Sequence, residues 1–502
     1  MKQNVKIRLS LYGIISAISY SYLVMVPKPG ISIPIFLLIQ FTSVYLALRN
    51  RPEIKNTNGI LMFIPILILS LNYFISGSNM WRITNFIAIT TLYSIMFLIV
   101  NNQLSLDRQS SKFIFNVIAN IFVPICSFSV PFKWFFSGNK SSSIERFKIK
   151  RILMGIMVSM PCIIFLLIIL SSADMIFSER VRGLMIWFNN NFNLNFIYRL
   201  FVGLVAGLYL FGFLYTTFPS EESDKIKHFI DNADGFKVEK KINADLIVIN
   251  ILLISIVTVY TAFISIQFKY LFAGAELPYG LNFAEYARRG FFELVFLSVI
   301  NVGLILLSIF LLKEKIYYEK TIWSNVTKAL LLYLCTVTAV LLVSSFYRMM
   351  LYDNEYGFTR LRIIVYLFLL FEAIGLAVTL KFILKPSFNI IAVYCIIIFM
   401  YYLTLNIVPI DYVIAKRNID MYFKTNSDNL DREYLISLST DAAPQIQRLL
   451  ESKDVDIITK YKAKMYFNNL KTSLDNSDSN WQCYNLADEK AKRILTEILK
   501  SY

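Results

Sequence analysis

The chain has 502 residues, of which 56% are hydrophobic and only 17% are charged. Soluble domains usually carry about 25% charged residues, so this deficit indicates a chain that largely faces lipid. The formal net charge of +16 does not indicate nucleic acid, because cytoplasmic loops of membrane proteins collect Lys and Arg and no basic stripe carries interleaved stacking aromatics. Five scattered cysteines and a single histidine argue against a disulfide framework, a zinc site or a Ser-His-Asp hydrolase. We therefore expect no metal, no cofactor and no nucleic-acid partner.

Long apolar runs recur along most of the chain. A bilayer core needs about twenty apolar residues per spanning helix, so this repetition predicts a polytopic membrane protein. The first run follows Lys2, Lys6 and Arg8, as in a signal peptide, but it is too long and lacks a clear small-residue cleavage site, so we expect an uncleaved helix. The predicted spans cover residues 9–26, 31–48, 60–76, 83–100, 152–176, 197–218, 246–270, 291–312, 326–346, 363–384 and 388–408.

Residues 113–136 decide between eleven and twelve helices. The segment is apolar, but Pro124 and Pro131 interrupt it and it is rich in aromatics, which favours a helix lying at the membrane interface. With eleven spans and a cytoplasmic amino terminus, most loop Lys and Arg lie inside, whereas a twelfth span removes this positive-inside bias. We predict an all-α bundle of about eleven transmembrane helices, with twelve as the alternative, over residues 1–409.

The tail, residues 410–502, is predicted to be a small helical module outside the membrane. After Ile410 it has 14 Lys plus Arg and 14 Asp plus Glu, so its charge is balanced. Apolar residues at helical spacing predict helices over 431–451, 457–470 and 488–499. We expect Trp481 and Tyr484 to dock the module, either internally or on the membrane domain. An odd number of spans places it on the extracytoplasmic side.

Three polar groups stand at the ends of the apolar runs. The first closes the fifth span at residues 170–174, the second covers residues 278–294, and the third covers residues 347–362. In the eleven-helix topology all three lie at the outer face, where they are expected to form either a pocket for an anionic headgroup, sugar or peptide terminus, or a network that ties helices together. A further carboxylate, Glu372, lies deep in a span, as a hydrogen-bonded group or as part of a proton or ion path. The candidate pocket residues are Asp174, Glu285, Arg288, Arg289, Glu293, Arg348, Glu355, Arg360 and Arg362.

Several motifs around these groups carry a resemblance. They are Ser172-Ala173-Asp174 with Phe177, the block from Ala284 to Leu294, Tyr356-Gly357-Phe358-Thr359 with Arg360 and Arg362, and, in the tail, Asn418-Ile419-Asp420 and Asp441-Ala442 with Pro444. From about residue 60 onward the chain resembles bacterial polytopic membrane proteins known as a domain of unknown function, in the group numbered 4153 and 4173. The resemblance implies the fold and the candidate residues, and it carries no activity.

Three functions stay open at this point. The first is an integral membrane protein of the bacterial cell envelope, in the inner membrane, which binds, senses or assembles. Its partners would be membrane lipids and a protein held by the module. The second is a secondary transporter of a small or anionic solute that uses Glu372. The third, less expected because no catalytic motif is present, is an enzyme on lipid-linked substrates, with Asp174 or Glu285 as base and arginines as anion clamps.

Overall fold

The computed structural model describes residues 3–49, 57–101, 110–137, 174–191, 194–218, 245–267, 291–319, 321–425, 430–475 and 480–500, with isolated positions between 159 and 171. Every regular element in these residues is a helix. Nine helices in the described part are long and apolar enough to cross a membrane, and two shorter apolar helices accompany them. The predicted fold class, an all-α membrane helix bundle, is confirmed.

The amino-terminal bundle begins with two helices in one line, because α1 runs directly into a π-helical turn, η1. Gly203 and Gly207 of α9 let that helix approach α1 closely, since a Cβ on Gly207 would lie 2.6 Å from the Cβ of Ala17. The bundle comprises α1 (Gln3–Ser19), η1 (Tyr20–Val24), α2 (Ser32–Leu48), η2 (Thr57–Met62), α3 (Phe63–Ile75), α4 (Arg82–Val100), α5 (Ser110–Cys126), α6 (Ser129–Ser137), α8 (Met175–Asn191) and α9 (Leu194–Tyr215).

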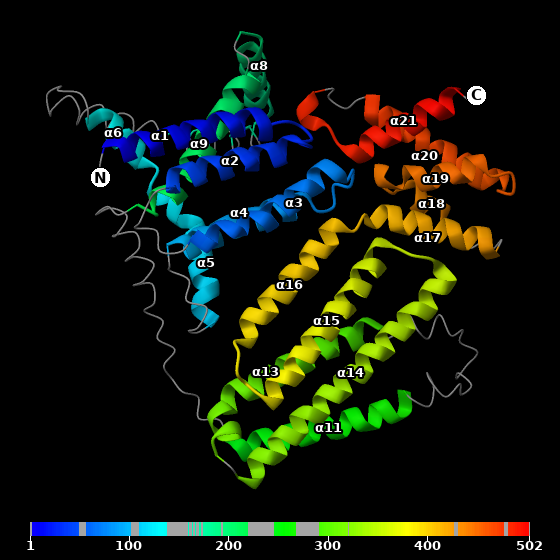
Figure 1. Cartoon of the computed structure of the whole chain (residues 1–502). Helices are drawn as coiled ribbons and strands as arrows, with labels where there is room; N and C mark the ends of the chain where they lie inside the picture. The colour runs from blue at the N-terminus through cyan, green and yellow to red at the C-terminus, as the bar shows by residue number, and fades with distance from the viewer. Residues whose placement is uncertain are drawn as a thin grey trace.

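The segment at 113–136 forms α5 and α6. In Figure 1, α5 runs at a steep angle to α1, α2 and α4 and extends below the left end of α4. Pro124 of α5 meets α9 at Gly212, where a Cβ would lie 2.6 Å from the Pro124 backbone. By length and composition 117–134 could still cross a membrane, so the interfacial placement stays a prediction that the crossing angle favours.

A second bundle lies below the first in Figure 1. Exposed residues of its helix α11, such as Val248, Ile251 and Val259, are aliphatic, as expected of a surface that meets lipid. The two bundles are joined by an amide cluster, in which Asn85 of α4 donates to the side-chain oxygen of Asn406 at 2.7 Å. The second bundle comprises α11 (Leu246–Gln267), α13 (Phe291–Tyr317), α14 (Ile322–Tyr356), α15 (Arg360–Leu384) and α16 (Ile390–Ile407).

The carboxy-terminal helices form the module at the right of Figure 1. The helix expected over 431–451 is broken at Ser437–Ser439, and Pro444 stands in the first turn of the helix that resumes, a position where proline is favoured. The module comprises α17 (Ile410–Thr425), α18 (Arg432–Ile436), η6 (Thr440–Ala442), α19 (Ala443–Glu451), α20 (Ile457–Asp475), η7 (Trp481–Cys483) and α21 (Leu486–Lys500). Its apolar core continues into the membrane helices through Ile363 and Leu405.

Candidate functional site

The first two predicted polar groups have local roles where the structure describes them. Asp174 accepts the backbone N–H of Phe177 at 2.9 Å, which caps the start of α8. Glu293 is exposed in the first turn of α13. Glu285, Arg288 and Arg289 lie outside the described residues, so the convergence of the three groups stays a prediction.

The third group holds the module against the membrane helices. Arg360 donates from Nε and Nη2 to the two carboxylate oxygens of Asp411 at 2.6 and 2.7 Å. Asp411 also accepts the backbone N–H of Ser439 at 2.9 Å, and its side chain is 2% exposed. Burial raises the pKa of Asp411, but the hydrogen bonds from Arg360 and Ser439 outweigh it and hold the pKa below its usual value.

The other residues of this group surround the turn between α14 and α15. The guanidinium of Arg362 lies 3.2 Å from Asp353, 4.1 Å from the centre of the Tyr352 ring, and donates to the Gly357 carbonyl. Arg348 is buried in α14 and Glu355 lies in its last turn. Both anion-clamp candidates in the described residues, Arg360 and Arg362, are therefore already paired with carboxylates of this chain.

A second contact joins the module to the turn between α3 and α4. Asp441 accepts the hydroxyl of Ser76 at 2.7 Å and the N–H of Gly77 at 3.2 Å. The amide of Asn485 donates to the carbonyls of Tyr73 and Ser76 at 2.9 and 2.7 Å. Burial raises the pKa of Asp441 in spite of the hydrogen bonds that it accepts. The folded protein therefore favours the protonated form of this carboxyl.

A third contact joins the module to the turn between η1 and α2. Gly30 and Ile31 donate their N–H groups to the carbonyls of Gln482 and Tyr484, both at 2.9 Å. The Trp481 ring packs on Tyr22 of η1. The sequence allowed Trp481 to dock either inside the module or on the membrane domain. The structure shows the contact with the membrane domain.

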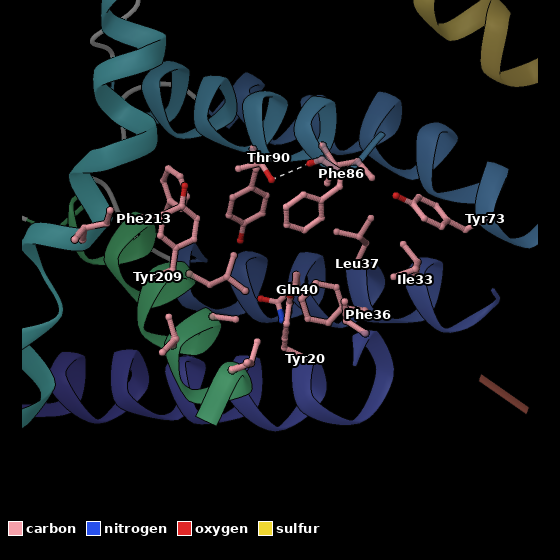
Figure 2. A pocket seen from close by; sticks show the side chains of 18 of the residues that line it. Tyr20, Ile33, Phe36, Leu37, Gln40, Tyr73, Phe86, Thr90, Tyr209 and Phe213 are labelled. Atoms are coloured by element: carbon pink, nitrogen blue, oxygen red, sulfur yellow. Dashed lines mark hydrogen bonds between the residues drawn. The ribbon is translucent and has the colours of Figure 1, made fainter. Parts of the chain in front are cut away.

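An apolar cavity of about 540 Å³ lies inside the amino-terminal bundle (Figure 2). In that view Phe86 and Thr90 of α4 lie opposite Leu37 and Gln40 of α2, with Phe213 at one end and Tyr73 at the other. Its walls come from η1, α2, α4, α5 and α9, with one residue from α3. The lining residues are Tyr20, Val24, Ile33, Phe36, Leu37, Gln40, Tyr73, Phe86, Ile89, Thr90, Tyr93, Ile125, Phe128, Val202, Val205, Ala206, Tyr209, Leu210 and Phe213.

Several polar side chains of the wall are hydrogen-bonded within the protein. Gln40 accepts from Ser16 at 2.9 Å and donates to Ser19 at 3.3 Å. The hydroxyl of Tyr93 bonds that of Tyr12 at 2.7 Å, and Tyr209 donates to the Ile121 carbonyl at 2.8 Å. The wall therefore offers an occupant mainly hydrocarbon and aromatic surface.

The wall of the cavity reaches both the apolar surface of the protein and the contact with the module. Phe86 and Ile125 line it and are still 55% and 50% exposed, so its wall continues onto the lipid-facing surface. Tyr73, at the other end of the view from Phe213 in Figure 2, is the residue whose carbonyl accepts from Asn485 of the module. No sequence pattern marks this cavity, because its walls use the same apolar residues as any packed membrane helix.

Comparison with known proteins gives one match. A family model described as a domain of unknown function (DUF4153) matches residues 63–449. No curated protein and no solved structure matches the chain. The matched range includes α3, α4 and α9 of the cavity and the second bundle, and it ends in α19 of the module.

Proposed function

This chain belongs to the DUF4153 family, and we propose that it is a lipid-binding protein that takes one hydrocarbon chain of a membrane lipid into the apolar cavity. The observation that carries this proposal is a cavity of about 540 Å³ with a mainly apolar wall, in which Gln40 and Tyr209 are hydrogen-bonded within the protein. This volume is within the range of about 300–1,000 Å³ that small-ligand sites occupy. A hydrocarbon chain suits such a wall, because it leaves no polar group to be satisfied.

Two further features support a binding site here. Tyr20 and Val24 belong to the π-helical turn η1, and π-helical turns inside helices are frequent at functional sites. Phe86 and Ile125 extend the wall onto the lipid-facing surface, so a chain enters sideways from the bilayer without passing through water. The headgroup stays near the polar turns that hold the module.

The test fills the cavity. Ala206 lies in the wall, and an Ala206→Phe substitution places a ring where the chain would lie. We expect the lipid that co-purifies with the protein, measured by mass spectrometry after extraction from washed nanodiscs, to fall at least about tenfold, which corresponds to 1.4 kcal/mol. Thr90→Phe should act in the same way from the opposite wall.

Ala373→Phe is the matched control, because Ala373 is exposed on α15 in the other bundle. It adds the same ring to a surface that faces lipid and should leave bound lipid unchanged. Equal lipid content in wild type, Ala206→Phe and Thr90→Phe, with unfolding temperatures preserved, would contradict the proposal.

We further propose that the protein lies in the bacterial inner membrane with the module on the extracytoplasmic side. The turns at 25–31, 76–81 and 357–359 contact the module, and the eleven-helix topology assigns these same three turns to one side. A Lys492→Cys variant without the natural cysteines tests this, because Lys492 is exposed on α21. We expect a membrane-impermeant thiol reagent to label it in intact cells. Labelling only after permeabilisation would place the module in the cytoplasm.

A further inference from the structure

A second membrane-buried site lies in the other bundle, around Glu372. This carboxyl lies near the middle of α15, which has 25 residues. At a rise of 1.5 Å per residue it is about 18 Å along the helix axis from Arg360. A carboxylate at that depth is costly unless a positive charge or a proton accompanies it.

The contacts of Glu372 leave half of its carboxyl unoccupied. Oε1 accepts the hydroxyl of Ser298, on α13, at 2.7 Å. Oε2 is buried and has no hydrogen-bond partner among the described residues. The described residues also give Glu372 no Lys or Arg within ion-pair distance. A positive charge that balances the carboxylate of Glu372 must therefore come from something other than the described side chains around it.

Asn301 adds an independent observation. It lies on α13, three residues after Ser298 and on the same face, and it is fully buried. Neither its side-chain oxygen nor its nitrogen has a hydrogen-bond partner among the described residues. Since a buried amide without hydrogen bonds is unfavourable, the side chain of Asn301 is available to a ligand.

The remaining polar neighbours are two tyrosines and a cysteine. Tyr260 of α11 lies next to Asn301. Tyr394 of α16 lies close enough to Glu372 for an electrostatic interaction between the two side chains. Cys335 of α14 lies near Tyr394 in turn. The described helices around the carboxyl thus offer oxygen atoms and no fixed positive charge.

We infer that Glu372, Ser298 and Asn301 form a binding site for one monovalent cation, a proton or Na⁺, in the middle of the membrane. Glu372 supplies the negative charge, and the side-chain oxygens of Ser298 and Asn301 supply neutral ligands. The site is separate from the lipid cavity, because it is built by α13 and α15 and not by the amino-terminal bundle. This inference therefore goes beyond lipid binding and does not depend on it.

The experiment uses dicyclohexylcarbodiimide, an apolar reagent that modifies protonated carboxyl groups, on the full chain in nanodiscs. Mass spectrometry of a digest follows modification at Glu372 from about pH 5 to about pH 9, in NaCl or in choline chloride at equal ionic strength. A proton site predicts that modification declines as pH rises, equally in both salts. A Na⁺ site predicts at least about tenfold less modification in NaCl than in choline chloride at one pH.

Two controls keep the result specific. Glu293, exposed in the first turn of α13, reports in the same digest and should not respond to Na⁺. Thermal unfolding provides a second readout, in which wild type responds more strongly to pH or Na⁺ than Glu372→Gln does, and the difference is the contribution of Glu372. Modification that ignores both pH and Na⁺ overturns the inference. So does absent modification together with identical unfolding profiles of wild type and Glu372→Gln.

Discussion

Replacing Arg360 with Met will lower the free energy of unfolding of the module by about 3 kcal/mol. The substitution preserves the length of the side chain and removes both hydrogen bonds to Asp411. Asp411, whose side chain is 2% exposed, is then left as a buried carboxylate that, among the described residues, is bonded by Ser439. We take the lower end of the range for a broken buried pair, because the Arg360 side chain is itself 31% exposed.

The effect is measured by denaturant unfolding in nanodiscs, with trypsin cleavage of the module as a second readout. Arg493→Met is the matched control, since Arg493 is 74% exposed and pairs with Glu489 one turn away on α21. Exposed pairs of this kind contribute about 0.3–0.5 kcal/mol. A change in Arg360→Met no larger than that of Arg493→Met would show that the ion pair does not hold the module.

The pH dependence of this contact has a definite sign. The folded-state pKa of Asp411 is below its usual value, so its contribution is present above the unfolded-state pKa and is lost as pH falls through the folded-state pKa. The difference between wild type and Arg360→Met should therefore be constant near neutral pH and shrink in acid. Asp441 acts in the opposite direction, because burial raises its pKa and its contribution is lost as pH rises through that value.

Replacing Gly30 with Ala will detach the segment around Tyr484 from the membrane domain. A Cβ at Gly30 would lie 2.2 Å from the carbonyl oxygen of Tyr484 and 2.9 Å from that of Cys483. These are backbone atoms and cannot rotate away, so the two hydrogen bonds from Gly30 and Ile31 are lost. At about 1 kcal/mol for each bond, the contact should weaken by about 2 kcal/mol.

Hydrogen exchange measures this weakening directly, at the amides of Gly30 and Ile31. Both should exchange about thirtyfold faster in Gly30→Ala, the factor that corresponds to 2 kcal/mol. Gly183→Ala is the control, because no atom lies within 4 Å of a Cβ there and Ala is favoured over Gly inside a helix. Unchanged exchange in Gly30→Ala would mean that the segment shifts to accept the methyl group without losing its bonds.

The sequence predicted the membrane class and the helices well, because these depend on local hydrophobicity and period. The helices expected over 457–470 and 488–499 are α20 and α21. The break inside 431–451 was missed, since Ser437–Ser439 differ little from an exposed helical turn in composition. Contacts such as that of Asn485 with Tyr73 join residues 412 positions apart, and no local pattern marks them.

The candidate site was harder to predict for a related reason. Arg360 and Arg362 were singled out from the sequence as candidate pocket residues, but their partners Asp411 and Asp353 could not be chosen from sequence among the many carboxylates. A cavity forms where apolar side chains do not fill the space between helices. The hydropathy of a sequence segment contains no information about this packing. Glu372 was identified from sequence because one ionisable residue inside an apolar run is visible without a structure.

The contact between residues 482–485 and the turns at Gly30 and Ser76 can form only late in the synthesis of the chain. Asn485 follows its acceptor Tyr73 by 412 residues, and translation proceeds at about 5–20 residues per second. The turns at Gly30 and Ser76 are therefore exposed for roughly 20–80 s before their covering segment leaves the ribosome. During that time the N–H groups of Gly30 and Ile31 and the carbonyls of Tyr73 and Ser76 lack the partners that this segment supplies. A product cut short before Gln482 lacks these partners permanently.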